Sequence, residues 1–243
     1  MGVAFITGAG SGIGAGTARV LAGHGHTVVC ADLDLDAAER VAAELGSGHA
    51  VRLDVGDPDA CRTAVEDTVA RFGRVDHVVT CAGTNMRAPA HELSAADFRR
   101  VMDINVLGTL SVAQAAARDM IARGEPGSMV FIGSINSVIA LPGQTAYGTS
   151  KAAVVMLGRV LAVDWGGYGI RVNVVGPGLT RTPMAAGMLA DEDRVAWAME
   201  RIPLRRVAEP EDIGDVIAFL LSDDARHVTG TFLPIDGGWM TGV

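Results

Sequence analysis

The feature that most constrains the fold is a short apolar segment that runs directly into three glycines near the amino terminus. Residues 3–7 (VAFIT) are rich in Val, Ile and Phe, which is typical of a buried strand. Gly8, Gly12 and Gly14 follow, and a helical pattern begins at Ala15. Glycine is required where a backbone turns sharply or approaches another group closely. A strand, a glycine turn and a helix N-terminus together predict an anion-binding turn, because free N–H groups and the helix dipole converge there.

An acidic residue strengthens this interpretation. Asp32 ends the next apolar run, residues 27–31. Dinucleotide-binding turns are followed by a carboxylate roughly 20 residues further on, although their usual G-x-G-x-x-G spacing differs from the one in this chain. The alternative is an ordinary tight turn between strand and helix, with Asp32 as a helix cap before Leu33. The combination of turn and carboxylate favours a dinucleotide.

Strands and helices alternate along the rest of the chain. Apolar runs predict further strands at residues 50–54, 75–82, 128–134, 170–175 and 231–235. Helical patterns occupy residues 35–45, 58–72, 94–121, 146–165 and 209–222, and residues 180–201 form an insertion with short helices of its own. We therefore expect an α/β fold: a Rossmann-type doubly wound parallel sheet of about seven strands, with helices on both faces in three αβα layers. No repeat or linker divides residues 1–243, which we expect to form a single domain.

Composition argues against several classes of protein. Lys+Arg number 20 against 28 Asp+Glu, and a net charge of −8 without a basic run disfavours nucleic-acid binding. No apolar stretch is long enough to cross a bilayer, and no basic segment precedes the first strand, so we expect neither a membrane span nor a secretory signal. Cys30, Cys61 and Cys81 lie far apart, which predicts reduced thiols in a cytoplasmic protein. The histidines are scattered, and no metal site is expected.

Two polar side chains at the start of the helix 146–165 have the spacing of an acid/base pair. Tyr147 and Lys151 stand four residues apart and therefore share one helix face. A tyrosine hydroxyl has a free pKa near ~10, and an ammonium within ~4–6 Å favours the phenolate and lowers that pKa. Ser134, at the end of the preceding strand, could donate a hydrogen bond to a substrate oxygen. Tyr-x-x-x-Lys alone is common in ordinary helices, so it is the glycine turn that makes a general acid/base the better interpretation.

Taken together, these motifs resemble the short-chain dehydrogenase/reductase family over essentially the whole chain. Residues 7–14 (TGAGSGIG) resemble its T-G-x-x-x-G-x-G turn, and Asp54-Val55 its adenine-contacting pair. Residues 81–83 (CAG) stand where the family usually has Asn-Ala-Gly, and residues 202–213 and 236–238 are also similar. The substitution of Cys81 for asparagine implies a modest loss of stability, and a redox role for that thiol is the alternative.

The resemblance implies a catalytic tetrad and a set of dinucleotide contacts. In the tetrad Tyr147 exchanges a proton with the substrate oxygen, Ser134 holds that oxygen, Lys151 biases the tyrosine and binds the nicotinamide ribose, and Asn105 anchors a water on the proton path. The implied cofactor contacts are Gly8, Gly10, Ser11, Gly12, Ile13, Gly14, Asp32, Leu33, Asp54, Val55, Cys81, Ala82, Gly83, Tyr147, Lys151, Pro177, Gly178, Thr180 and Thr182.

The cofactor we expect is NAD(H). A carboxylate at Asp32 accepts hydrogen bonds from ribose hydroxyls but repels a 2′-phosphate. Ser11 and Leu33 occupy the positions at which NADP-selecting relatives place an arginine. We therefore expect an oxidoreductase that interconverts a secondary alcohol and a ketone with NAD(H).

The substrate is less constrained. The expected contacts are Ser134, Asn136, Gln144, Tyr147, Arg87 and Gly178. Asn136 and Gln144 suit substrate hydroxyls and Arg87 suits a carboxylate, so a polyol, a sugar or a hydroxy acid is favoured. A 3-oxoacyl thioester reductase is the alternative enzyme, and a dinucleotide-binding sensor the non-enzymatic one. Apolar residues of the insertion (Met184, Met188, Leu189, Trp197 and Met199) form either an adaptable substrate lid or packing against the body. The apolar excess on residues 146–165 predicts a homotetramer, or a homodimer.

Overall fold

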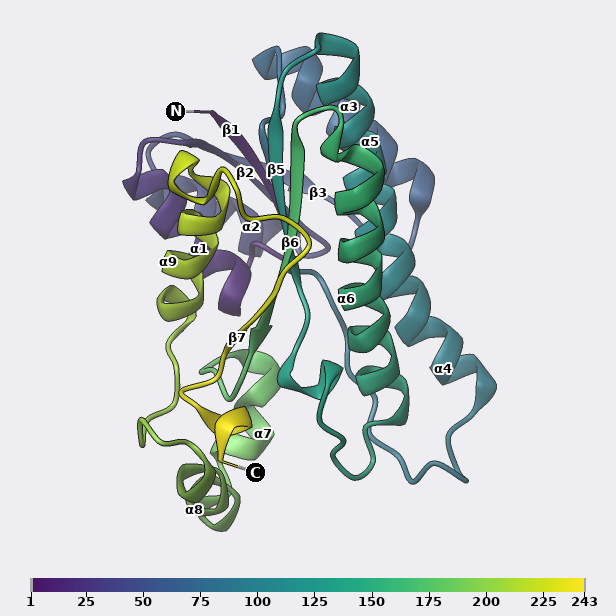
Figure 1. Cartoon of the computed structure of the whole chain (residues 1–243), viewed down its shortest axis with the longest axis vertical. Coiled ribbons are helices and arrows are strands. Elements are labelled where there is room, and N and C mark those ends of the chain that lie inside the picture. Colours follow the sequence, from purple (N-terminus) through teal and green to yellow (C-terminus); the bar gives the residue numbers. More distant parts are fainter. Residues whose placement is uncertain (1, 243) are drawn as a thin grey trace.

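The computed structural model describes residues 2–242, which form a parallel sheet between two layers of helices (Figure 1). The sheet has seven strands in the order β3-β2-β1-β4-β5-β6-β7, and every neighbouring pair is parallel. The strands are β1 (Val3–Thr7), β2 (Thr27–Asp32), β3 (Gly48–Arg52), β4 (His77–Thr80), β5 (Gly127–Ile132), β6 (Ile170–Pro177) and β7 (Phe232–Ile235). The chain reverses its direction of winding between β1 and β4, which confirms the doubly wound sheet.

The helices cover both faces of the sheet. They are α1 (Gly12–Gly23), α2 (Leu35–Glu44), α3 (Pro58–Phe72), α4 (Ala95–Met102), α5 (Gly108–Arg123), α6 (Thr145–Gly166), α7 (Ala186–Leu189), α8 (Glu192–Arg201) and α9 (Pro210–Leu221). In Figure 1, α1, α2 and α9 lie on one side of the strands, and α3, α5 and α6 on the other. Helices α7 and α8 lie beyond the end of the sheet, close to the carboxyl terminus. None of the helices within residues 2–242 combines the length and apolarity that crossing a membrane requires.

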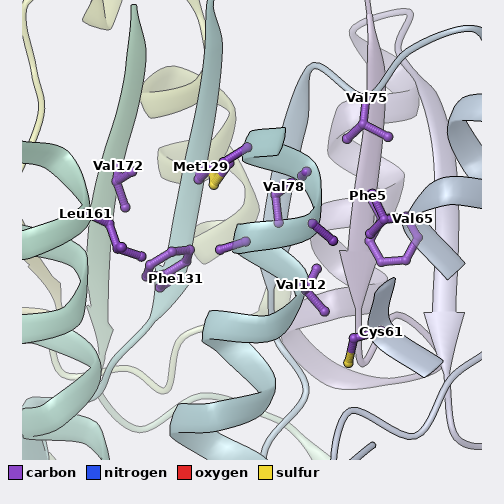
Figure 2. Close-up of a cluster of buried hydrophobic side chains, with 14 of the residues drawn as sticks. Phe5, Cys61, Val65, Val75, Val78, Val112, Met129, Phe131, Leu161 and Val172 are labelled. Atoms are coloured by element: carbon purple, nitrogen blue, oxygen red, sulfur yellow. The ribbon is translucent and has the colours of Figure 1, made fainter. Parts of the chain in front are cut away.

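Each face of the sheet has its own apolar core. Phe5 and Phe131 point toward α3, α5 and α6, where Figure 2 shows them among Val65, Val112 and Leu161. Ile6 and Val130, one position away along the same strands, belong to the core beneath α1, α2 and α9. This alternation follows from the two-residue period of a strand. Both faces are covered, so the strands are apolar almost throughout, as expected for a parallel sheet.

Several strand ends differ from the predicted ranges, and at the start of β4 a tertiary contact is the reason. Strand β4 was expected over residues 75–82 but occupies His77–Thr80. The backbone of Val75 is bonded instead to two side chains of α5: its N–H donates to Asp119 Oδ2, and its carbonyl accepts from Arg123. Strand β5 was expected to reach Ser134 but ends at Ile132, and β3 occupies residues 48–52 instead of 50–54.

The long helix expected over residues 94–121 is interrupted. Helix α4 passes into a π-helical turn at Asp103–Leu107 before α5 begins at Gly108. Such turns are often found at functional sites, and this one carries Asn105. The insertion after Thr180 has the short helices that the sequence predicted: a 3₁₀ turn at Pro183–Ala185, then α7 and α8.

Candidate active site

The glycine turn between β1 and α1 has the conformation that only glycine tolerates well. Gly8 and Gly12 have positive φ angles of 65° and 51°, and a Cβ on Gly14 would collide with the carbonyl oxygen of Gly8. Ser11 precedes α1 without a side-chain capping hydrogen bond, and the first turn of the helix has no acidic residue. The leading N–H groups of α1 are therefore available to an anion, and the turn fits a dinucleotide pyrophosphate.

Asp32 lies at the end of β2 and is tied to the same turn. Its Oδ2 accepts the Gly10 N–H at 2.8 Å, and its Oδ1 accepts the Asp34 N–H at 3.0 Å. The cap of α2 is Asp34, whose carboxylate accepts the Ala37 N–H at 3.1 Å. The alternative role of Asp32 as the helix cap is therefore wrong. Because its carboxylate lines a cavity beside Leu33, which is 60% exposed, it is placed to meet a ribose.

Two adjoining cavities open at the carboxyl end of the sheet. The smaller, of about 480 Å³, lies over the glycine turn, and the larger, of about 910 Å³, lies beneath α7 and α8. They share the walls formed by Ile13, Gly83, Thr84, Ile132, Tyr147, Thr182 and Met184. Tyr147 therefore stands where the two cavities meet, with a cofactor-sized site on one side and a separate chamber on the other.

Most of the predicted contacts line one cavity or the other. The smaller is lined by Gly8, Ser11, Gly12, Ile13, Gly14, Asp32, Leu33, Asp54, Val55, Cys81, Ala82, Gly83, Tyr147, Lys151 and Thr182. The larger is lined by Arg87, Ser134, Asn136, Gln144, Tyr147, Pro177, Gly178, Thr180 and Thr182. Two residues line neither: Gly10 packs under Asp32, and Asn105 is 1% exposed behind the cavity wall. Pro177, Gly178 and Thr180, which were expected to contact the cofactor, line the larger cavity and not the smaller one.

Tyr147 and Lys151 lie as close together as expected, but the pKa of Tyr147 is not shifted in the expected direction. Lys151 Nζ lies 5.7 Å from the centroid of the Tyr147 ring and donates a hydrogen bond to the Ile132 carbonyl at 2.8 Å. Burial lowers the pKa of Lys151 to about 8. Burial also raises the pKa of Tyr147, while a hydrogen bond from the Ser134 hydroxyl acts in the opposite direction. The net shift of the Tyr147 pKa in the cofactor-free site is therefore upward, opposite to the lowering expected from the ammonium, because burial is its largest cause and Lys151 is not among its causes.

Ser134 is held in place by the turn that follows β5. It caps the 3₁₀ turn Ile135–Ser137, and its Oγ accepts the Asn136 N–H at 3.1 Å. Ser137 Oγ accepts the Ser134 N–H at 3.2 Å and donates to the Lys151 carbonyl at 2.9 Å. The turn is therefore fastened to the helix that carries Tyr147. Because a hydroxyl has one proton, the Ser134 O–H remains able to donate to the phenol or to a substrate oxygen.

Asn105 joins the loop after β4 to α6. Its Oδ1 accepts the Thr84 N–H at 2.8 Å, and its Nδ2 donates to the Thr84 carbonyl at 3.0 Å and to Ser150 Oγ at 2.9 Å. The Ser150 hydroxyl in turn donates to the Tyr147 carbonyl at 2.7 Å. This side chain therefore holds together two walls of the site. The sequence analysis missed Ser137 and Ser150, since nothing about a serine within a turn or a helix distinguishes such a role.

Three polar side chains on the wall of the larger cavity, Asn85, Arg87 and Gln144, are hydrogen-bonded to one another. With its amide oriented by its neighbours, the Gln144 oxygen accepts N–H groups from Arg87 Nε and Nη2, both at 3.0 Å, and its nitrogen donates to Asn85 Oδ1 at 3.0 Å. The Gln144 amide, expected to be open to substrate hydroxyls, is thus already hydrogen-bonded within the protein. This pairing could not be read from the sequence.

The lid residues divide between the two roles left open. Met184 and Trp197 line the larger cavity, Leu189 and Met199 pack around a small core that includes Ile202 and Trp239, and Met188 does both. Trp197 and Trp239 meet edge to face with their ring centroids 5.4 Å apart. Trp239 also lines the cavity, a contact that the sequence analysis missed because this residue lies near the end of the chain, outside the motifs.

Burial disfavours the thiolate form of Cys81. Cys81 lines the smaller cavity, and burial raises its pKa to about 12, only partly offset by Lys151. The thiolate is the reactive form of cysteine, so a raised pKa disfavours the redox alternative.

Known proteins resemble this chain over nearly its whole length. A family model described as "Enoyl-(Acyl carrier protein) reductase" matches residues 8–240. The cis-4-hydroxycyclohexanecarboxylate dehydrogenase of Sinomonas cyclohexanicum is 41% identical, over 98% of this chain and 96% of its own length. The D-threitol dehydrogenase of Mycolicibacterium smegmatis is 38% identical, over 98% of this chain and 92% of its own. Among solved structures, a gluconate 5-dehydrogenase from Burkholderia cenocepacia in complex with NADP and tartrate superposes with a TM-score of 0.95 at 33% identity, covering 99% of this chain and 96% of the other.

Proposed function

The chain belongs to the short-chain dehydrogenase/reductase family and is an NAD(P)-linked oxidoreductase acting on CH–OH or C=O groups, and we propose that it uses NAD(H) to interconvert a secondary alcohol and a ketone. The observation that carries the proposal is the position of Tyr147, which forms part of both cavity walls. A proton donor at that junction can reach a substrate in the larger cavity beside a dinucleotide in the smaller one.

The side chains divide the work of the reaction. A bound nicotinamide would supply or accept the hydride. Ser134 donates a hydrogen bond to the substrate oxygen, where negative charge develops as a ketone is reduced. Tyr147 gives that oxygen its proton in reduction and removes it in oxidation. Lys151, which is 5% exposed, would favour ionisation of the phenol and would hydrogen-bond the nicotinamide ribose of a bound dinucleotide. Asn105 holds the loop after β4 against α6.

The catalytic test is Tyr147→Phe. The variant removes the hydroxyl and keeps the ring, so turnover should fall by a factor on the order of 10²–10⁴, the range of general acid–base catalysis, while NADH binding stays unchanged. Turnover is measured by nicotinamide absorbance, and NADH binding by fluorescence titration. Full activity in this variant refutes the assignment. A protein that binds NADH but oxidises or reduces none of the substrates below would instead be a dinucleotide sensor.

NAD preference is proposed from Asp32. Its carboxylate is held at the cavity wall by the Gly10 and Asp34 N–H groups, so it has little freedom to move away from a 2′-phosphate. The related gluconate 5-dehydrogenase was crystallised with NADP, so direct competition is needed. The ratio of kcat/KM for NAD and NADP with one alcohol decides the question, and a preference for NADP would overturn the proposal.

The substrate class is proposed to be a polyol, a sugar or a hydroxy acid. The relatives named above act on a hydroxy acid and on a polyol, and the larger cavity offers both amide and guanidinium groups. A panel of D-threitol, gluconate, 4-hydroxycyclohexanecarboxylate and a 3-hydroxyacyl thioester, each with NAD, ranks the alternatives. The thioester is included because the matching family model is described as an enoyl-(acyl carrier protein) reductase.

The chain is also proposed to be a single cytoplasmic domain. It is further proposed to assemble as a homotetramer or a homodimer. On α6, Met156, Val160 and Val163 are exposed, Val163 to 81%, and on the neighbouring π turn and α5 Leu107 and Ile121 are exposed as well. Such a surface is stabilised when a second copy covers it. Light scattering of the purified protein measures the number of subunits, and a monomer would exclude this assembly.

A further inference from the structure

One polar wall of the larger cavity is not used by the mechanism above. Arg87 lies in the loop after β4, and that loop is fastened to the start of α6: the Ala88 N–H donates to the Gly143 carbonyl at 3.1 Å, and Ala88 pairs with Gln144. Gln144 is the residue that precedes α6, and Tyr147 lies in the first turn of that helix. Backbone contacts therefore carry Arg87 to the helical turn that presents the catalytic phenol.

The side chain of Arg87 is positioned by a neutral partner. Gln144 is 5% exposed. Its amide oxygen accepts both Nε–H and Nη2–H of the guanidinium, and its amide nitrogen donates to Asn85 Oδ1. Two of the five guanidinium N–H groups are used in this way, and the others remain available. No Asp or Glu within residues 2–242 lies at ion-pair distance from Arg87. The cation is thus oriented without being neutralised by these residues.

The other walls of the same cavity are largely apolar. Leu141, Met184, Met188, Trp197 and Trp239 contribute carbon and aromatic surface. The other cationic side chain on the wall, Arg194 of α8, is paired with Asp191 at 3.0 Å. Within the described residues, this chamber therefore combines one guanidinium that lacks a carboxylate partner with an apolar surface.

We propose that the substrate is a hydroxy acid with an apolar carbon skeleton, that Arg87 binds its carboxylate, and that Gln144 is the positioning residue of Arg87. The inference rests on the proposed alcohol oxidation and narrows its substrate class. A guanidinium fork matches the planar carboxylate, and the charge-assisted bond is stronger than one to a neutral hydroxyl. A neutral polyol would give the exposed guanidinium no counter-charge, and those of its hydroxyls that do not reach a polar group such as Asn136 would lie against Met and Trp side chains.

The test compares 4-hydroxycyclohexanecarboxylate, from the panel above, with its neutral carboxamide, which keeps the ring and the alcohol. The wild-type enzyme should prefer the acid by ~10- to 100-fold in kcat/KM, the worth of a charge-assisted hydrogen bond. Arg87→Gln should abolish this preference through KM, leaving kcat/KM for the carboxamide within ~3-fold of wild type. Arg87→Lys keeps the charge and should restore part of the preference. Arg40→Gln, which removes one charge from the exposed face of α2, is the matched control.

The role of Gln144 is tested by Gln144→Met, which keeps the length of the side chain but lacks the amide. It should raise KM for the acid by ~3- to 10-fold without changing kcat for the carboxamide, and should add nothing in the Arg87→Gln background. An effect of equal size on both substrates, or one that persists without Arg87, would mean a purely structural role and refute the positioning.

Binding without turnover separates this inference from the proposed function. Cyclohexanecarboxylate has no alcohol, and its affinity, measured by isothermal titration calorimetry with NADH present, should fall at least ~10-fold in Arg87→Gln. Equal kcat/KM for acid and carboxamide in the wild type overturns the carboxylate site while alcohol oxidation stands. If none of the alcohols reacts, the proposed function fails, and the titration still decides whether Arg87 binds a carboxylate.

Discussion

Replacing His77 by phenylalanine should change how the stability of this protein depends on pH. His77 begins β4, at the end of the sheet opposite the cavities, and its ring meets that of His26 edge to face at 4.9 Å. Its Nδ1 is buried without a hydrogen-bond partner. Burial lowers the pKa of His77 from 6.5 to about 4, with repulsion from His26 and Arg171 adding to the shift and Asp76 opposing it.

The sign and size of the effect follow from this pKa. Above pH 6.5 the imidazole is neutral in both the folded and the unfolded chain and contributes nothing. Below it, the unfolded chain binds a proton that the folded chain does not, so acid favours unfolding. With pKa values of 6.5 and about 4, the loss at pH 5 is about 2 kcal/mol, and the full loss of roughly 3 kcal/mol is reached only below pH 4.

Urea unfolding at pH 8 and pH 5, followed by tryptophan fluorescence at constant salt and protein concentration, measures this difference. Phenylalanine fills a similar volume and cannot titrate, so His77→Phe should lose about 2 kcal/mol less than wild type between the two pH values. His91→Gln, which removes an exposed imidazole, should keep the wild-type dependence. Parallel pH profiles for wild type and His77→Phe would refute the reasoning.

Three further predictions follow from the site. Asn105→Ala removes three hydrogen bonds and should lower the free energy of unfolding by roughly 2–4 kcal/mol in urea titrations, given about 1 kcal/mol for each bond. Gly14→Ala places a Cβ against the Gly8 carbonyl and should weaken NADH binding on the order of tenfold or more in fluorescence titrations. Burial raises the pKa of Cys30 and Cys81 to about 12 and that of Cys61 to about 11, so the native protein should react with no equivalents of a thiol reagent at pH 8 and with three after unfolding.

A separate result would contradict each of these three predictions. An Asn105→Ala protein as stable as wild type would mean that Thr84 and Ser150 find other partners. Tight NADH binding by Gly14→Ala would mean that the turn does not hold the dinucleotide. Rapid labelling of Cys81 in the native protein would revive the redox alternative.

Features that depend only on residues close together in the sequence could be predicted from it. The turn at residues 8–14, the carboxylate at Asp32 and the pairing of Tyr147 with Lys151 depend on local backbone requirements and on helical periodicity. The alternation of apolar runs was enough for the sheet and its two helical layers, because a parallel strand buried on both faces must be apolar along its length.

Only the tertiary structure decided how charged and polar groups meet. Gln144 bonds to Arg87 because the loop after β4 pairs with the residues that precede α6. Asn105 bonds both to Thr84 in that loop and to Ser150 on α6. The pKa of Tyr147 is raised instead of lowered because burial strips water from it. Desolvation and long-range contact are properties of the packed environment, and no local pattern in the chain encodes them.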